Sequence, residues 1–230
     1  MSEGTGAGDL PDRKALVHYL RQSSRGPLKP KELARGLDVP NAAYRAFKVR
    51  LRELESDGTL YRVKGNRYAV PEKINLVVGR LSVIRSGDGF VVPDDASRED
   101  VFVPSTDHGS AMDGDQVVAR IESRPRGRNP VGRIIKVLER AHPTLVGTFR
   151  TSEGLRYVDP QDKRVLRDVL VPAGEEMDAG DGDVVLVKIV HYGDRKLNPL
   201  GAVEKVLGKM TDPGVDVLSV LYGHGLPLEF

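Results

Sequence analysis

A pattern of about 65 residues occurs twice in this chain, and this repeat limits the fold more strongly than any other feature. Glycine, proline, aspartate and aromatic positions of the first copy recur in the second at an offset of 67 to 69 residues. The matched positions are Gly79 and Gly147, Phe90 and Tyr157, Pro93 and Pro160, Asp100 and Asp168, Pro104 and Pro172, Gly114 and Gly182, Asp115 and Asp183, Gly132 and Gly201, Val137 and Val206, and Leu138 and Leu207. The repeat predicts two copies of one small domain.

Each copy is expected to contain five short strands, with a Gly-Asp turn before the fourth. The fourth strand is expected over 116–122 and 184–190, and the last over 131–139 and 202–207. Five short strands in so small a unit fit a Greek-key barrel of the OB type. We therefore expect barrels over residues 76–141 and 145–209.

Two runs in the first copy, GDGFVVP and DVFVP, alternate with a period of two. This alternation lets the valines face a core while Phe90 and Phe102 face away from it. Aromatic residues make up only 5% of the chain, and it has no tryptophan, so two outward rings need an explanation. They suit base stacking, which contributes about 1–3 kcal/mol per base. The alternative is that both rings lie under a loop or against a neighbouring domain.

The loop between the last two strands also carries candidate contacts, because this loop is a binding element of OB folds. In the first copy it holds three arginines within five residues, and arginine can pair with phosphates and stack on bases. The equivalent loop of the second copy, 191–198, repeats this at lower charge. The candidate contacts of the two barrels are Phe90, Phe102, Arg124, Arg126, Arg128, Tyr157, His191, Arg195 and Lys196. The alternative for the loops is an ordinary turn with solvated charges.

Residues 12–71, ahead of the repeat, predict three helices and a two-stranded hairpin, which together make a winged helix. The helices are expected over 12–22, 31–36 and 41–56, and the hairpin turns at Lys64-Gly65-Asn66. Residues 12–70 hold 14 Lys and Arg against 6 Asp and Glu, whereas 71–230 hold 21 against 25. This excess predicts nucleic-acid contact. The candidate residues are Arg45, Lys48, Arg52, Arg62, Lys64 and Arg67. The alternative is a solvated charged face on a module used for docking.

Several classes of chemistry are disfavoured by the sequence. The chain has no cysteine, which excludes disulfides and thiolate sites, and its five histidines show no ligand spacing. Asp113 with Asp115, and Asp181 with Asp183, could be read as metal-binding pairs. Their identical places in the two copies favour turn chemistry instead. No stretch approaches the roughly 20 apolar residues of a membrane span, and no signal peptide follows Met1, so we expect a cytoplasmic protein that meets no membrane.

The pattern GDGFVVP followed by DVFVP resembles the two strand motifs of cold-shock domains. The tandem copies, ending in VLG and then LPLEF, resemble the front of the ribonuclease R family, whose members are processive 3′ to 5′ exoribonucleases of bacteria. The sequence departs from the pattern at Asp88 and Pro104, where an aromatic residue and a histidine are usual. Leu155 and Leu170 also replace expected rings, so we expect weaker stacking in the second barrel.

The resemblance implies an α+β multidomain chain, with a winged helix-turn-helix followed by two cold-shock barrels of the OB type. It implies that the chain captures single-stranded or structured RNA, with duplex nucleic acid on the winged helix, and guides RNA to a catalytic domain. Residues 1–11 are expected to be disordered, and 210–230, with a helix near 214–222, to connect to that domain. The clustered aspartates that hold Mg²⁺ in the family are absent, so no cofactor is expected in this chain and no catalytic residue is assigned. The alternative is a complete regulatory nucleic-acid-binding protein.

Overall fold

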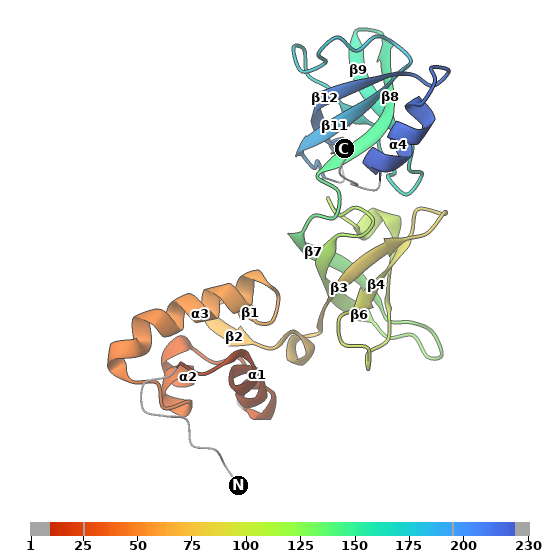
Figure 1. Ribbon diagram of the computed structural model, residues 1–230. Coiled ribbons are helices and arrows are strands. Elements are labelled where there is room, and N and C mark those ends of the chain that lie inside the picture. The colour runs from red at the N-terminus through yellow and green to blue at the C-terminus, as the bar shows by residue number, and fades with distance from the viewer. Residues whose placement is uncertain (1–9, 25, 195, 224–230) are drawn as a thin grey trace.

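The structure is a computed structural model, and it describes residues 10–24, 26–194 and 196–223. Figure 1 shows a helical unit, a first β-barrel and a second β-barrel following one another along the chain. Arg195 and the closing LPLEF, which were singled out in the sequence, lie outside the described residues.

The described chain opens with three α-helices whose ends are set by local hydrogen bonds. The bounds are α1 Arg13–Gln22, α2 Pro30–Gly36, the 3₁₀ turn η1 Asn41–Ala43 and α3 Tyr44–Ser56. The carboxylate of Asp12 accepts a hydrogen bond from the Ala15 N–H at 2.7 Å, which caps the start of α1. The Glu32 carboxylate reaches back to the Lys29 N–H at 2.6 Å at the start of α2. The third helix was expected from residue 41, but its first turn is the 3₁₀ turn η1.

A short hairpin follows α3 and closes the core of the helical unit. Strands β1 Tyr61–Val63 and β2 Arg67–Ala69 pair antiparallel across the three-residue turn predicted at 64–66. Leu16, Phe47, Leu51 and Leu60 are fully buried, and they come from α1, α3 and the start of the hairpin. The apolar side of α3 therefore packs inward. The basic side chains of Arg45, Lys48 and Arg52 are left on the surface.

A 3₁₀ turn, η2 Pro71–Ile74, lies between the helical unit and the first barrel and is bound to α1 and the residue after it. Arg21 of α1 forms an ion pair with Glu72 at 2.6 Å, and Lys73 Nζ donates to the Ser23 carbonyl at 2.8 Å. Gly58, which follows α3, has a φ of +79°, and a Cβ placed there would lie 2.6 Å from Leu138 Cδ1 of the first barrel. The helical unit thus contacts the first barrel directly.

Both repeats fold into closed five-stranded barrels with the same strand order. The first barrel contains β3 Leu76–Val83, β4 Gly89–Pro93, β5 Val101–Val103, β6 Gln116–Ser123 and β7 Val131–Glu139, with the 3₁₀ turn η3 Ser105–Asp107 after β5. The second contains β8 Thr144–Ser152, β9 Leu155–Pro160, β10 Val169–Leu170, β11 Asp183–His191 and β12 Leu200–Lys209. The orders are β3-β4-β5-β7-β6 and β8-β9-β10-β12-β11. These are OB-type barrels, as the sequence predicted.

Corresponding irregularities bend the longest strand pair of each barrel. The β6–β7 ladder and the β11–β12 ladder each contain three register shifts, while the third strand pairs in parallel with the fifth. Such bulges increase local twist and let a small sheet close on itself. Fully buried valines on alternate strand positions fill the interiors, with Val91 and Val101 in the first barrel and Val158 and Val185 in the second.

Helix α4 Val215–Gly223 packs on the outside of the second barrel, against β8, β11 and β12 (Figure 1). Buried Val215 joins Val146, Val184 and Leu186 in a small apolar cluster on that side. Val217 and Val220 point away from this cluster and are 57% and 59% exposed. No helix in the described part of the chain is long and apolar enough to cross a membrane.

A joint of charged and aromatic side chains connects the barrels. Arg140, between β7 and β8, donates to the Ser110 carbonyl at 2.7 Å and to the Asp115 carboxylate at 2.8 Å. The same guanidinium lies 3.7 Å from the centroid of the Tyr192 ring in the second barrel. Arg164 of the second barrel forms an ion pair with Asp113 of the first at 2.8 Å. We call Arg140, Asp115, Tyr192, Arg164 and Asp113 the inter-barrel joint.

Candidate nucleic-acid interface

Phe90 and Phe102 form a pair of rings on the outer face of the first barrel. They lie directly opposite each other on β4 and β5, with ring centroids 5.5 Å apart and an interplanar angle of 61°. Both are partly exposed, whereas Val91, Val101 and Val103 beside them are fully buried. The predicted inward and outward faces of these strands are therefore correct. The edge-to-face contact contributes about 0.5–1.5 kcal/mol beyond area burial.

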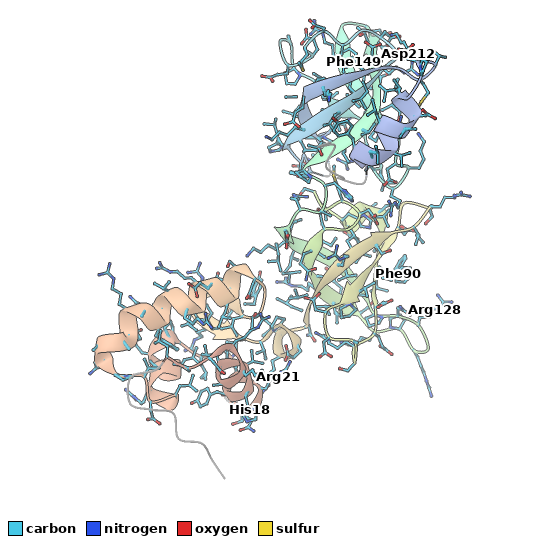
Figure 2. The ribbon with its side chains drawn as sticks, viewed as in Figure 1. His18, Arg21, Phe90, Arg128, Phe149 and Asp212 are labelled. Atoms are coloured by element: carbon cyan, nitrogen blue, oxygen red, sulfur yellow. The ribbon has the colours of Figure 1, made fainter. Side chains whose placement is uncertain are left out.

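The arginine loop connects β6 to β7 and is tied to the ring pair by the backbone. The N–H of Phe102 donates to the Pro130 carbonyl at 2.8 Å, and Phe102 pairs in parallel with Val131 at the end of the loop. Figure 2 shows Arg128 on this projecting loop, on the same side of the barrel as Phe90. The ring pair and the loop thus lie on the same side of the barrel and are joined through the backbone of β5 and β7.

The charge of this loop is not neutralised within the described residues. Arg124, Arg126 and Arg128 are all exposed, and none forms an ion pair with a carboxylate in the described part of the chain. Cations next to exposed rings are the two components of a single-strand-binding surface, since phosphates need charge and bases need a π-face.

The second barrel repeats this arrangement with one ring. Tyr157 of β9 lies opposite Leu170 of β10, and the Leu170 N–H donates to the Pro199 carbonyl at 2.8 Å, as Phe102 does to Pro130. Tyr157 is partly exposed. The replacement of the second ring by Leu170 leaves this face with less stacking surface than the first.

The loop of the second barrel holds its cations differently. His191 was expected in the loop but ends β11, where it pairs with Leu200. Its Nδ1 accepts a hydrogen bond from the Gly193 N–H at 3.1 Å. Lys196 is exposed, and its backbone N–H is bound by the Asp194 carboxylate at 2.7 Å. Arg195, between these residues, lies outside the described part of the chain.

A groove of about 520 Å³ lies between α3 and the hairpin of the helical unit. Four predicted contacts line it, namely Lys48, Arg52, Arg62 and Lys64. We call this the basic groove. Arg62 is partly neutralised by Glu55 at 3.1 Å, while Lys48 lies over the Tyr44 ring at 5.5 Å.

The other two predicted contacts of the helical unit lie outside the basic groove. Arg45 is exposed one turn before Lys48 on α3. Arg67 faces α2, where it forms an ion pair with Glu32 at 3.6 Å and donates to the Pro27 carbonyl at 3.2 Å. The sequence grouped Arg67 with the others because it lies in the hairpin, but its charge is paired on another side of the unit.

Of the paired aspartates, Asp115 and Asp183 accept a backbone hydrogen bond within their own turns, as predicted, whereas Asp113 and Asp181 accept one from a distant strand. Asp113 accepts a hydrogen bond from the Val83 N–H at 2.8 Å, and Asp181 accepts the equivalent bond from the Thr151 N–H at 2.8 Å. Asp115 is fully buried among backbone donors and Arg140. The Lys209 ammonium, bonded to Asp183, lowers the pKa of that carboxyl. In the described part of the chain, no three His, Cys, Asp or Glu side chains are grouped to hold a metal ion.

The inter-barrel joint was not predicted. Arg140 and Tyr192 are 52 positions apart and lie outside the strand motifs, so no local pattern marks them as partners. The Gly-Asp turns shared by the two copies were the one hint of this joint in the sequence. They place Asp115 at the end of the barrel where β7 ends and Arg140 follows.

Comparison with known proteins agrees with this architecture. A family model described as "Ribonuclease B OB domain" matches residues 79–137, and one described as "Cold shock domain" matches residues 157–230. The two five-stranded barrels and these two matches identify the class as a protein with tandem OB and cold-shock domains. The whole chain resembles ribonuclease R of Vibrio parahaemolyticus, with 30% identity over 225 residues, covering 96% of this chain and 27% of that protein.

A second relative extends the match. Ribonuclease R of Acidithiobacillus ferrooxidans is 30% identical over 223 residues, covering 96% of this chain and 50% of that protein. Over nearly its whole length the chain is therefore similar to members of the ribonuclease R family, which confirms the resemblance found in the sequence. It spans between about a quarter and a half of the length of these relatives.

A solved structure shares the fold. It is "Mycoplasma genitalium RNase R in complex with ribose methylated single-stranded RNA", with a TM-score of 0.59 and 18% identity, covering 67% of this chain and 25% of that one. At this level of identity the likeness concerns the fold alone.

Proposed function

We propose that this chain is the RNA-binding part of a ribonuclease R-type 3′ to 5′ exoribonuclease. It captures single-stranded or structured RNA and guides it to a catalytic domain. The observation that carries the proposal is that the ring pair of β4 and β5 lies on the same side of the barrel as the β6–β7 loop, whose arginines form no ion pair within the described residues. The relative from Mycoplasma genitalium was solved with single-stranded RNA, which supports RNA as the ligand.

This surface binds RNA through two separable forces. Phe90 and Phe102 stack bases, which contributes about 1–3 kcal/mol per base with little dependence on sequence. Arg124, Arg126 and Arg128 pair with phosphates and release counterions, so their contribution falls as salt rises. Tyr157, His191, Arg195 and Lys196 supply the weaker second surface.

The helical unit is proposed to be a winged helix that contacts structured RNA or another duplex. The support is the basic groove, where four cations from α3 and the hairpin line one hollow. A concave basic surface follows a phosphate backbone without reading bases, so this contact is expected to be strongly salt-dependent and tolerant of sequence.

The proposed domain division follows the elements. The winged helix covers residues 12–71, the first barrel 76–141 and the second 145–209, with 210–230 leading to the catalytic domain. We also propose that the protein works in the cytoplasm, where a ribonuclease R-type enzyme meets RNA.

Mg²⁺ is proposed to act in the catalytic domain. In the described part of the chain the paired aspartates do not fit a metal, because their oxygens already accept backbone N–H groups or bind Arg140 and Lys209. Metal-assisted cleavage of a phosphodiester needs carboxylates that position the ion.

The test separates binding from cleavage. The purified chain is mixed with end-labelled single-stranded RNA and Mg²⁺, and both the bound fraction and the products are measured. We expect salt-dependent binding without release of mononucleotides. Absence of binding at low salt would refute the proposed function, and cleavage that persists after removal of contaminating nucleases would refute the assignment of catalysis to another domain.

A further inference from the structure

One end of the first barrel carries the turn 113–115 and is covered by the second barrel. Asp113 accepts a hydrogen bond from the Val83 N–H through one carboxylate oxygen, and its other oxygen lies 2.8 Å from Nη1 of Arg164 in the second barrel. Met112, beside the same turn, packs against the apolar core of the second barrel. This end therefore receives its neighbour in two ways, with a carboxylate that binds an arginine and with a methionine that packs on apolar side chains.

The second barrel carries the equivalent turn, 181–183, held by equivalent contacts. Asp181 accepts a hydrogen bond from the Thr151 N–H at 2.8 Å, and Lys209 forms an ion pair with Asp183 at 2.6 Å. Asp212 accepts a hydrogen bond from the Lys209 N–H at 2.8 Å, and Figure 2 shows Asp212 at the end of the second barrel that points away from the first. The end by which the first barrel meets its neighbour is thus repeated, and no third barrel covers it in the described part of the chain.

The side chains suited to receive a neighbour are exposed at this second end. Asp181 is exposed, and its carboxylate forms no ion pair among the described residues. Met177, in the loop before the turn, is 58% exposed, and Met210, directly after Lys209, is 52% exposed. Methionine adapts to the shape of a partner and is frequent on protein-binding surfaces. We call Met177, Asp181 and Met210 the free end.

The charges around the free end call for a basic partner. Residues 174–183 hold five Asp and Glu and no Lys or Arg. The helical unit has the opposite balance, with 14 Lys and Arg against 6 Asp and Glu over residues 12–70. Surfaces of opposite sign attract each other and fix the orientation in which two molecules meet.

The outer face of α3 offers the matching groups. Arg45, Val49 and Arg52 follow one another at spacings of four and three residues, so they lie on one side of the helix. Both arginines are exposed and form no ion pair within the described chain, and Val49 between them is 50% exposed. Arginines on either side of an exposed apolar side chain complement a carboxylate that lies beside methionines.

Within one chain these two surfaces lie apart, because Figure 1 shows the helical unit beside the first barrel and the second barrel extending away from it. We propose that the free end of one copy of the chain binds the outer face of α3 of a second copy, with Asp181 paired to Arg45 and the two methionines packed around Val49. The joined surfaces differ, so the contact can repeat from copy to copy. The inference goes beyond RNA binding, since association of two copies withdraws Arg45 from nucleic acid.

The experiment is sedimentation velocity of the nucleic-acid-free 230-residue chain over a range of protein concentrations. The parent should associate at low salt, and the association constant should fall as salt rises. Asp181→Arg and Arg45→Glu should each weaken association at least about 5-fold, because an attraction becomes a repulsion. Asp181→Asn keeps an acceptor for the Thr151 N–H and should also weaken association, which covers the case in which Asp181→Arg does not fold.

Mixing the two charge variants gives the sharpest result. The Asp181→Arg and Arg45→Glu chains associate weakly alone, but they should associate when mixed, because each contact between unlike chains again pairs opposite charges. The matched control is Glu99→Arg, which reverses the charge of an exposed carboxylate on the first barrel. This control should associate as the parent does, and thermal melts identify any variant that is not folded.

Three results would overturn the proposal. They are a parent chain that sediments as a monomer at every concentration, a mixture of the two folded charge variants that does not associate, and a loss of association in Glu99→Arg as large as that in Asp181→Arg. A photoreactive benzoylphenylalanine in place of Met177 supplies an independent measurement. Cross-links from it to α3 of another copy support the contact, and cross-links to any other segment exclude it.

Discussion

At the scale of single residues, the ring pair of the first barrel combines packing with exposure. Phe90 and Phe102 contact each other edge to face, yet each keeps part of its surface in solvent. Alanine at either position therefore removes two things, a face for a base and a modest contact within the barrel wall. The two effects can be measured independently.

We expect Phe90→Ala and Phe102→Ala each to weaken single-stranded RNA binding by about 1–3 kcal/mol with little change in salt slope. The free energy of unfolding should fall by about 0.5–1.5 kcal/mol, because the edge-to-face interaction of the rings is removed. Neutralising Arg124, Arg126 and Arg128 should instead lower the salt slope. Titrations and thermal melts of each variant check both quantities. A loss of about 3–5 kcal/mol of stability with unchanged RNA affinity would mark the rings as core residues.

His108 is buried beside β5, and its protonation is expected to make the stability of the first barrel depend on pH. Burial lowers the pKa of His108 below its ordinary value of 6.5, although the Val103 carbonyl, 3.2 Å from its Nε2, and the nearby Asp88 and Asp107 act in the opposite direction. The unfolded chain therefore binds this proton more readily than the folded chain. The contribution of neutral His108 is present above pH 6.5 and is lost as pH falls through the lower folded pKa.

We expect the melting temperature of the parent chain to fall from pH 7 toward pH 5 more steeply than that of His108→Gln, which keeps a donor for the Val103 carbonyl. Thermal melts in matched buffers provide the measurement. Parallel pH profiles for the two proteins would show that His108 titrates alike in the folded and unfolded chains.

At the scale of elements, the repeat was sufficient to predict both barrels and the faces of their ring-bearing strands. Period-two alternation fixes which side chains face the core, and the shared Gly-Asp turns align the strands. The sequence pattern could not predict on which side of the helical unit each arginine of the hairpin lies. Arg67 and Arg62 are both in the hairpin, but only Arg62 lines the basic groove, because Glu32 of α2 pairs with Arg67.

The exposed cations of α3, two of which line the basic groove, provide the element-scale prediction. Neutralising Arg45, Lys48 and Arg52 together should reduce the salt slope for structured RNA, by about 0.7–0.9 for each phosphate that the variant no longer binds. Arg67→Gln is the matched control and should leave the slope nearly unchanged, since that charge is already paired with Glu32. Filter binding at several salt concentrations measures both. Equal slopes for the parent and the triple variant would exclude α3 from the interface.

At the scale of the whole molecule, the inter-barrel joint connects the two barrels through charged and aromatic contacts. Asp115 is fully buried, and Arg140 supplies its charged partner while also covering the Tyr192 ring. This contact is distributed over three parts of the chain, which is why no single stretch of sequence indicated it.

Arg140→Met should destabilise the barrel pair by about 3 kcal/mol, because a buried carboxylate loses its ionic partner while keeping backbone donors. Calorimetry should then resolve two barrel transitions in place of one. The matched control is Arg13→Met, whose exposed ion pair with Asp57 at 3.5 Å contributes less than about 1 kcal/mol. Joint unfolding at the parent temperature in Arg140→Met would show that the barrels are coupled by other contacts.

Gly58 lies where the helical unit contacts the first barrel. Its φ of +79° strains any other residue at this position, and a Cβ built there would lie 2.6 Å from Leu138 Cδ1, so that the Leu138 side chain would have to move. We therefore expect a substitution at position 58 to strain its own backbone and displace Leu138, which would disturb the contact between the helical unit and the first barrel.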